Sequence, residues 1–146
     1  MKKYLSMMAI AMLVACFFVS CSDDDDDLGS SSDLIGTWVM VSYEGYEIDE
    51  GKKETYKGTY DISDQENMIT FEKDGTYFSE EDDDGSWKYS NGILTITWHD
   101  YDYGDDEIIK VKVIKLTSSE MVIEEHHKDR DEEYEYYSKM TFRKLK

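Results

Sequence analysis

Short stretches in which apolar or aromatic residues alternate with polar ones follow one another along most of this chain. An alternation with a period of two places successive side chains on opposite faces of a β-strand, so each stretch predicts a strand with one buried face. Asp74-Gly75 and Asn91-Gly92 are hairpin signals that separate neighbouring stretches. The alternating positions are Trp38 and Met40; Ile69 and Phe71; Leu94, Ile96 and Trp98; Ile109, Val111 and Val113; Met121 and Ile123; and Tyr134, Tyr136, Met140 and Phe142.

These stretches predict eight or nine short antiparallel strands joined by tight turns, with no convincing helix. Such an all-β, up-and-down meander either closes into a barrel or folds into a sandwich. Closure removes exposed strand edges, and the chain contains no proline to interrupt a sheet, so an eight-stranded barrel is favoured. Val113 and Ile114 are adjacent apolar residues, and this slip in the alternation predicts a β-bulge or a fully buried stretch.

Residues 1–20 have the layout of a secretory signal peptide rather than of a strand. Lys2 and Lys3 precede an apolar run over residues 5–19 that only Ser6 interrupts. The run is too short for a permanent membrane span, and nothing later in the chain approaches the roughly 18 apolar residues that a span needs.

Two cysteines near the end of this segment are candidate lipidation sites. Leu13-Val14-Ala15-Cys16 and Phe18-Val19-Ser20-Cys21 both resemble the lipobox of bacterial lipoproteins, in which the cysteine is acylated and becomes the first residue. Cleavage before Cys16 would leave three apolar residues on the mature tether, so Cys21 is favoured. The resemblance implies that the protein is anchored in the outer membrane through acylated Cys21, and no disulfide is then expected within the chain.

An acidic tether over residues 21–33 follows this cysteine. Its beginning resembles the export signal of surface lipoproteins of the Bacteroides type, which implies display on the outer face of the outer membrane. A solvated acidic spacer is the simpler alternative, because blocks of like charge repel one another. Residues 28–33 continue as a flexible Gly/Ser linker, and the folded domain is expected over residues 34–146. The export signal comprises Ser22, Asp23, Asp24, Asp25 and Asp26.

Acidic side chains outnumber basic ones by 34 to 16, which gives the 146-residue chain a formal net charge of −18. Residues 34–146 alone carry 28 acidic and 14 basic side chains, a net charge of −14. Nucleic acid is therefore excluded as a direct partner, because binding it requires a basic surface.

A family resemblance appears at the two ends of the predicted domain. Leu34-Ile35-Gly36-Thr37-Trp38 resembles the Gly-x-Trp opening of lipocalins, and Thr141-Phe142-Arg143-Lys144 resembles their closing strand. The resemblance covers nearly all of residues 34–146 and extends to the lipocalin-like domains of bacterial surface lipoproteins. It implies a barrel with Trp38 at its base and with Arg143 packed across the indole, so that Gly36, Trp38 and Arg143 form the fold signature.

The chain departs from the lipocalin pattern in two places. It has no match to the Thr-Asp-Tyr element of the second lipocalin motif, and residues 44–64 carry no clear assignment. Whether a ligand cavity is preserved is therefore open.

Motifs of catalysis are missing from the sequence. It contains no Gly-x-Ser-x-Gly elbow, phosphate loop or dinucleotide fingerprint, and a hydrolase is the weakest of the functional alternatives. His126 and His127 are adjacent, so they face opposite ways on a strand, and a zinc site would need His99 opposite one of them. The acidic segments 80–85 and 100–106 lack the spacing of the twelve-residue calcium loop, and no metal or cofactor is expected.

Two functions remain in view. The first is a non-enzymatic barrel that binds a small apolar or amphipathic molecule in its mouth, as eight-stranded barrels can. The second is an interaction module with a filled barrel that contacts an envelope component or partner protein through its loops or a sheet face. Exposed tyrosine and tryptophan side chains could also stack on a sugar, although core filling is the expected role of most of them.

Overall fold

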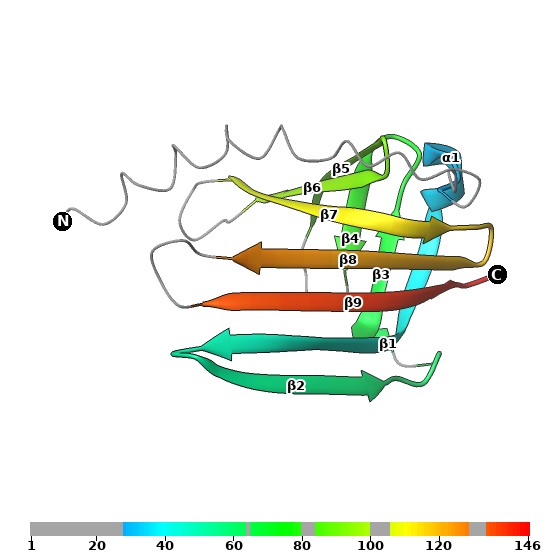
Figure 1. Cartoon of the computed structure of the whole chain (residues 1–146). Helices are drawn as coiled ribbons and strands as arrows, with labels where there is room; N and C mark the ends of the chain where they lie inside the picture. The colour runs from blue at the N-terminus through cyan, green and yellow to red at the C-terminus, as the bar shows by residue number, and fades with distance from the viewer. Residues whose placement is uncertain (1–27, 64, 80–83, 100–105, 129–133) are drawn as a thin grey trace.

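The computed structural model describes residues 28–63, 65–79, 84–99, 106–128 and 134–146. The described residues form nine strands, one short α-helix and one 3-10 turn. Figure 1 labels the strands and the α-helix along the chain. The helical elements are α1 (Ser31–Leu34) and η3 (Gln65–Asn67). The strands are β1 (Gly36–Asp49), β2 (Lys52–Thr59), β3 (Met68–Phe71), β4 (Thr76–Ser79), β5 (Asp84–Ser90), β6 (Ile93–His99), β7 (Asp106–Leu116), β8 (Glu120–Lys128) and β9 (Glu135–Lys144).

Every strand pairs antiparallel with its neighbours, and the sheet closes on itself. From β3 to β9 the strands lie in sequence order, and β1 pairs with both β3 and β9. These eight strands form the closed barrel that the alternation predicts, which confirms the all-β meander and excludes the sandwich. The ninth strand, β2, is an addition that pairs with β1 alone among the described strands.

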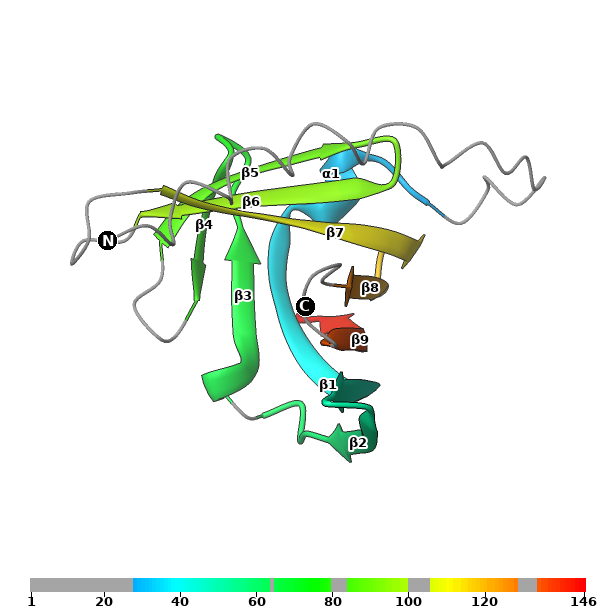
Figure 2. The same cartoon turned by 60° about the vertical axis from the view of Figure 1, so that its left-hand side comes forward.

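The long strand β1 divides the barrel into two halves. Its first residues, Gly36 to Val39, pair with β3, whereas Ser42 to Asp49 pair with β2 along the same edge. Figure 2 shows β1 curving from the helix α1 at one end to the β2 hairpin at the other. We call the α1 end the base and the β1–β2 turn end the mouth.

The turns follow local sequence chemistry. At the β3–β4 turn, the Asp74 carboxylate accepts hydrogen bonds from the backbone N–H of Thr76 at 3.0 Å and from its hydroxyl at 2.6 Å. At the β5–β6 turn, Asn91 and Gly92 both have positive φ, 52° and 73°, as a type I′ hairpin turn requires. Both hairpin predictions are therefore confirmed.

Two bulges set the phase of the side chains. The β7–β8 register shifts between Val113 and Lys115, which confirms the predicted slip. A second shift, which the sequence did not reveal, lies between Met40 and Ser42 on β1. Since a strand alternates its side chains, this extra residue makes Tyr43, rather than Ser42, the next inward-facing position after Met40.

The helix α1 covers the base of the barrel. The Asp33 carboxylate accepts hydrogen bonds from the backbone N–H of Ser30, at 2.7 Å, and from its hydroxyl, at 2.9 Å. This Ser-x-x-Asp pairing begins the helix and places Leu34, fully buried, in the core. The prediction of a flexible linker up to residue 33 is therefore wrong for residues 28–33, because Tyr89 also donates to the Leu28 carbonyl.

No helix within the described ranges has the length and apolar character needed to cross a membrane.

Candidate functional site

The base half of the barrel interior is filled by apolar and aromatic side chains. Trp38 is completely buried, and the rings of Phe71 and Trp87 meet edge to face with centroids 5.5 Å apart. A ligand cavity in this half is incompatible with such packing. The buried cluster comprises Leu34, Trp38, Phe71, Tyr77, Trp87, Leu94, Val111, Val113, Leu116, Met121, Ile123 and Phe142.

Two of the three predicted signature residues lie together at the base. The Trp38 indole N–H donates to the Leu34 carbonyl at 2.7 Å. Gly36 has a φ of +124°, and a Cβ there would lie 2.8 Å from Cε of Lys144. These contacts hold α1 and the start of β1 close to the end of β9.

Arg143 does not pack across the indole, so this prediction is wrong. The register pairs Trp38 with Lys144 and Val39 with Arg143, and cross-strand partners share a face of the sheet. Lys144 Nζ lies 5.0 Å from the Trp38 ring centroid and donates to the Asp33 carbonyl at 2.8 Å. The Arg143 guanidinium lies on the outer face, 3.2 Å from the Glu120 carboxylate.

The mouth half of the interior has a different lining. Across β1 and β9, Tyr43 pairs with Met140, Gly45 with Ser138 and Glu47 with Tyr136. Met140 packs against the core, so these pairs face inward. The inner wall therefore changes from apolar at Met140 to aromatic and acidic toward the mouth.

Four tyrosines form this inner wall, and we call Tyr43, Tyr56, Tyr134 and Tyr136 the tyrosine wall. The Tyr43 and Tyr56 ring centroids lie 6.3 Å apart, and those of Tyr134 and Tyr136 lie 6.2 Å apart. The ring of His127 stacks on Tyr136 at 5.7 Å. None of the four is buried, so their rings line a surface that solvent reaches.

Carboxylates lie among these rings. The Tyr136 hydroxyl donates to the Glu125 carboxylate, and partial burial together with that bond raises the pKa of Tyr136. Partial burial and the nearby Glu47 carboxylate likewise raise the pKa of Tyr134. Tyr134 and Tyr136 therefore stay neutral at physiological pH, and the wall presents their ring faces beside negative charge.

The expectation that most tyrosine and tryptophan side chains fill the core holds for the tryptophans, two of which are buried while Trp98 packs against the core, but not for the tyrosines. Among the tyrosines that the structure describes, only Tyr77 is buried. Tyr89 is partly buried, packs against the core and donates to the Leu28 carbonyl, and the others are partly or fully exposed. The alternation located these residues on strands but could not show that their rings remain partly exposed to solvent.

The outer face near the mouth carries a separate polar cluster. Tyr46 and Tyr137 stack at 5.7 Å, and their hydroxyls donate to Glu135 and Glu124, each at 2.9 Å. Hydrogen bonds from His126, Lys128 and Tyr46 lower the pKa of Glu135 to about 2. Adjacent His126 and His127 thus face opposite sides of the wall, as the alternation predicts. In the outer cluster, the Glu135 carboxylate is paired with His126 and Lys128.

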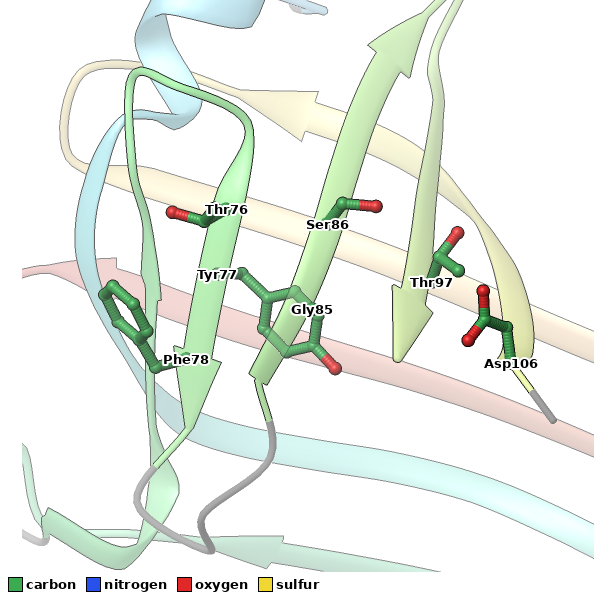
Figure 3. A pocket seen from close by; sticks show the side chains of 7 residues that line it. All are labelled: Thr76, Tyr77, Phe78, Gly85, Ser86, Thr97 and Asp106. Carbon is green, nitrogen blue, oxygen red and sulfur yellow. The ribbon is translucent and has the colours of Figure 1, made fainter. Parts of the chain in front are cut away.

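Two hollows lie on the outer faces of the barrel. The first, of about 480 Å³, is lined by residues of β4, β5, β6 and β7, and Figure 3 shows it from close by. The second, of about 490 Å³, lies over the outer cluster and is lined by Glu44, Gly45, Tyr46, Thr55, Tyr56, Lys57 and Tyr137.

Several predicted sites fall outside the described residues. These are the signal peptide over residues 1–20, Cys21 with the export signal Ser22 to Asp26, and most of the acidic segments 80–85 and 100–106. The side chain of His99 is likewise not described. Where the structure does describe the chain, no group of three or more His, Cys, Asp or Glu side chains is arranged to hold a metal ion.

Comparison with a family model agrees with this architecture. A family model described as a lipocalin-like domain matches residues 34–123, which is more than half of the chain and ends within β8. No curated protein sequence matches. Among solved structures, the chain is similar to insecticyanin from the tobacco hornworm Manduca sexta, at 9% sequence identity and a TM-score of 0.48. That similarity covers 80% of this chain and 64% of the length of insecticyanin.

Proposed function

The chain belongs to the family of lipocalin-like domains, and we propose that it binds a small amphipathic ligand in the mouth half of its barrel. The observation that carries the proposal is the tyrosine wall, which leaves partly exposed rings on the inner face beyond a filled apolar base. An apolar group of the ligand would reach Met140 and Tyr43, and a polar head would lie near Tyr136. The proposed role is binding rather than catalysis.

The charge of the wall indicates what kind of head group it prefers. Glu47 and Glu125 face inward, and Lys52, which lies at the mouth, is already paired with Glu54. A cation beside tyrosine faces gains about 0.5–2 kcal/mol, and carboxylates add attraction. We therefore expect an amphipathic cation to bind more tightly than a neutral or anionic molecule of the same size.

Binding of three eight-carbon probes to the purified protein tests this expectation. Octyltrimethylammonium should bind at least about tenfold more tightly than octanol, a difference of about 1.4 kcal/mol, and octanoate should bind most weakly. Glu125→Gln should remove most of the preference for the cation. Titration calorimetry at low salt measures all three affinities, since salt would screen the charge effect.

Glu124→Gln provides the matched control. Glu124 is the next residue along β8 but lies on the outer face, bonded to Tyr137, so its loss should leave the preference unchanged. Equal affinities for the cation and octanol would contradict the charge argument while leaving ligand binding intact. If none of the three probes binds, the ligand proposal itself fails.

The second candidate, an interaction module, is favoured by a specific feature of β2. This strand has no second neighbour among the described strands, and its eight residues include Lys52, Lys53 and Lys57 in an otherwise acidic domain. Such an edge could pair with an extended segment of a partner. A native mass spectrum that shows no co-purifying small molecule, together with failure of all the probes, would move the assignment to this candidate.

We also propose that the protein is a lipoprotein of the outer membrane, displayed on the cell surface. The lipobox-like sequence ending at Cys21 and the acidic run after it support this location. Cys21→Ala should abolish incorporation of labelled palmitate and release the protein from the membrane fraction, whereas Cys16→Ala should change neither. Protease added to intact cells should digest the protein, and complete protection would contradict surface display.

A further inference from the structure

The hollow on the outer face of β4, β5 and β6 lies outside the barrel interior and takes no part in the proposed mouth site. Thr76 pairs with Ser86, and Ser86 pairs with Thr97, so three hydroxyl-bearing side chains form one row across adjacent strands. Figure 3 shows this row, together with Asp106 of β7 beyond it. Tyr77 and Trp87 are buried in the core, so the alternating positions beside them, including this row, face outward.

The floor of the hollow includes Gly85 and the buried side chain of Tyr77. Gly85 lies between the hydroxyl row and the mouth, and a Cβ there would be 2.1 Å from the Thr97 carbonyl oxygen. Gly85 shares the inward parity of Trp87, and its lack of a Cβ allows β5 to approach β6 and the ring of Tyr77 closely. The volume of the hollow, about 480 Å³, falls within the roughly 300–1,000 Å³ of typical ligand sites.

The rim adds one aromatic ring and one carboxylate. Phe78 is 45% exposed, although a phenylalanine normally loses free energy by remaining in water, and it lies on β4 at one side of the hollow. Asp106, at the start of β7, lines the other side. The side chains of Ser86 and Thr97 lie between Phe78 and Asp106 (Figure 3).

This set of groups selects one class of ligand. Hydroxyl groups both donate and accept hydrogen bonds, and a carboxylate accepts them, which matches a molecule rich in hydroxyls. The C–H face of a sugar ring is apolar and can lie against an exposed aromatic ring. No lysine, arginine or histidine is among the seven lining residues that the structure describes, so none of these offers positive charge to a phosphate or carboxylate ligand. Its single exposed ring is too little apolar surface for a lipid chain.

We infer that this hollow is a binding site for a neutral saccharide, with Phe78 against the sugar ring and Ser86, Thr97 and Asp106 bonded to its hydroxyls. Thr76, whose hydroxyl donates to Asp74, would accept a hydrogen bond from the sugar. The site is independent of the mouth, because its row faces outward while the tyrosine wall faces inward. The protein would then hold a sugar on its surface and a separate small ligand within its barrel.

The test uses four neutral trisaccharides, maltotriose, cellotriose, xylotriose and mannotriose, added to the purified isotope-labelled protein. At least one should bind with a dissociation constant of about 1 mM or lower, and it should shift the amide resonances of Phe78, Gly85, Ser86 and Thr97. Phe78→Ala should weaken that binding at least about tenfold. Ile62→Ala, which removes a side chain 49% exposed that does not line the hollow, should leave the affinity unchanged.

Three results would overturn the inference. One is the absence of resonance shifts with all four sugars, and another is binding that shifts other resonances but not those of the hollow. The third is an affinity that Phe78→Ala does not reduce in a variant whose spectrum shows that it is folded. Failure of the octyl probes in the barrel would not affect this outcome, since octyltrimethylammonium and the trisaccharide should not compete.

Discussion

Replacing Trp38 by alanine is expected to lower the free energy of unfolding by about 3–5 kcal/mol, the usual range for removing a large aromatic side chain from a core. Trp38 is completely buried at the base of the barrel, and its indole N–H donates to the Leu34 carbonyl at 2.7 Å. The substitution leaves a cavity and also leaves that carbonyl without its partner. Urea denaturation followed by circular dichroism measures the loss, with the m-value checked for two-state behaviour.

Three further variants separate the contributions at this site. Trp38→Phe keeps an aromatic ring but loses the hydrogen bond, and should cost less than the alanine variant. Lys144→Met keeps the aliphatic stem and removes the charge over the indole, a loss of about 0.5–2 kcal/mol. Ile108→Ala, at a side chain that is 61% exposed, should change stability by no more than about 0.5 kcal/mol. If Trp38→Ala costs no more than Ile108→Ala, the description of the base as a packed core is wrong.

Replacing Gly85 by alanine is expected to destabilise the protein by about 2 kcal/mol or more, at the upper part of the range for overpacking. A Cβ at this position would lie 2.1 Å from the Thr97 carbonyl oxygen and 2.9 Å from Cα of Trp98. Both are backbone atoms of the paired strand β6, so no side-chain rotation relieves the clash and the strands must separate. The same denaturation measurement, with thermal unfolding as a second measure, records the effect.

Gly51 provides the matched control for Gly85. It lies in the β1–β2 turn with a φ of +76°, and a Cβ there would meet no atom within 4 Å. Gly51→Ala therefore suffers only the strain of a left-handed backbone, about 1–2 kcal/mol, and Gly51→Asn less, because asparagine tolerates that region. Equal losses for Gly85→Ala and Gly51→Ala would show that the clash with β6 does not limit the substitution.

The arrangement of strands could be predicted because its signals are local. Alternation at Leu94, Ile96 and Trp98 reports one buried face, and Asn91-Gly92 supplies the two positive φ values of a tight turn. The strand β2 was missed for the same reason. Its turn consists of Glu50 and Gly51, both with positive φ, and glutamate is not one of the residues typical of such a turn. Seven of the eight residues of β2 are exposed, so the strand carries no apolar alternation either.

The error at the fold signature has a different cause. Arg143 and Lys144 are adjacent basic residues at the end of β9, and a difference of one position decides which of them faces the indole. The pairing of Trp38 with Lys144 settles that phase. A short motif can therefore identify the family and the buried tryptophan, yet assign the cation above it to the wrong neighbour.

The candidate sites were the least predictable part. Tyr43 and Tyr136 are 93 positions apart in the numbering, and they reach one inner face only because β1 pairs with β9 and carries a bulge between Met40 and Ser42. The hollow over β4, β5 and β6 depends likewise on the pairing of these three strands. Neither the residue types nor their spacing along the chain predicts that these side chains lie on one face of the sheet.

The sequence by itself determined that this protein is an antiparallel all-β meander with tight hairpins and an acidic composition, because period, turn chemistry and charge are properties of neighbouring residues. The tertiary structure decided which half of the barrel is filled, which residue covers Trp38 and where the tyrosines gather. These features depend on the registers between strands distant in sequence, and a register is chosen by the packing free energy of the whole barrel rather than by any one segment.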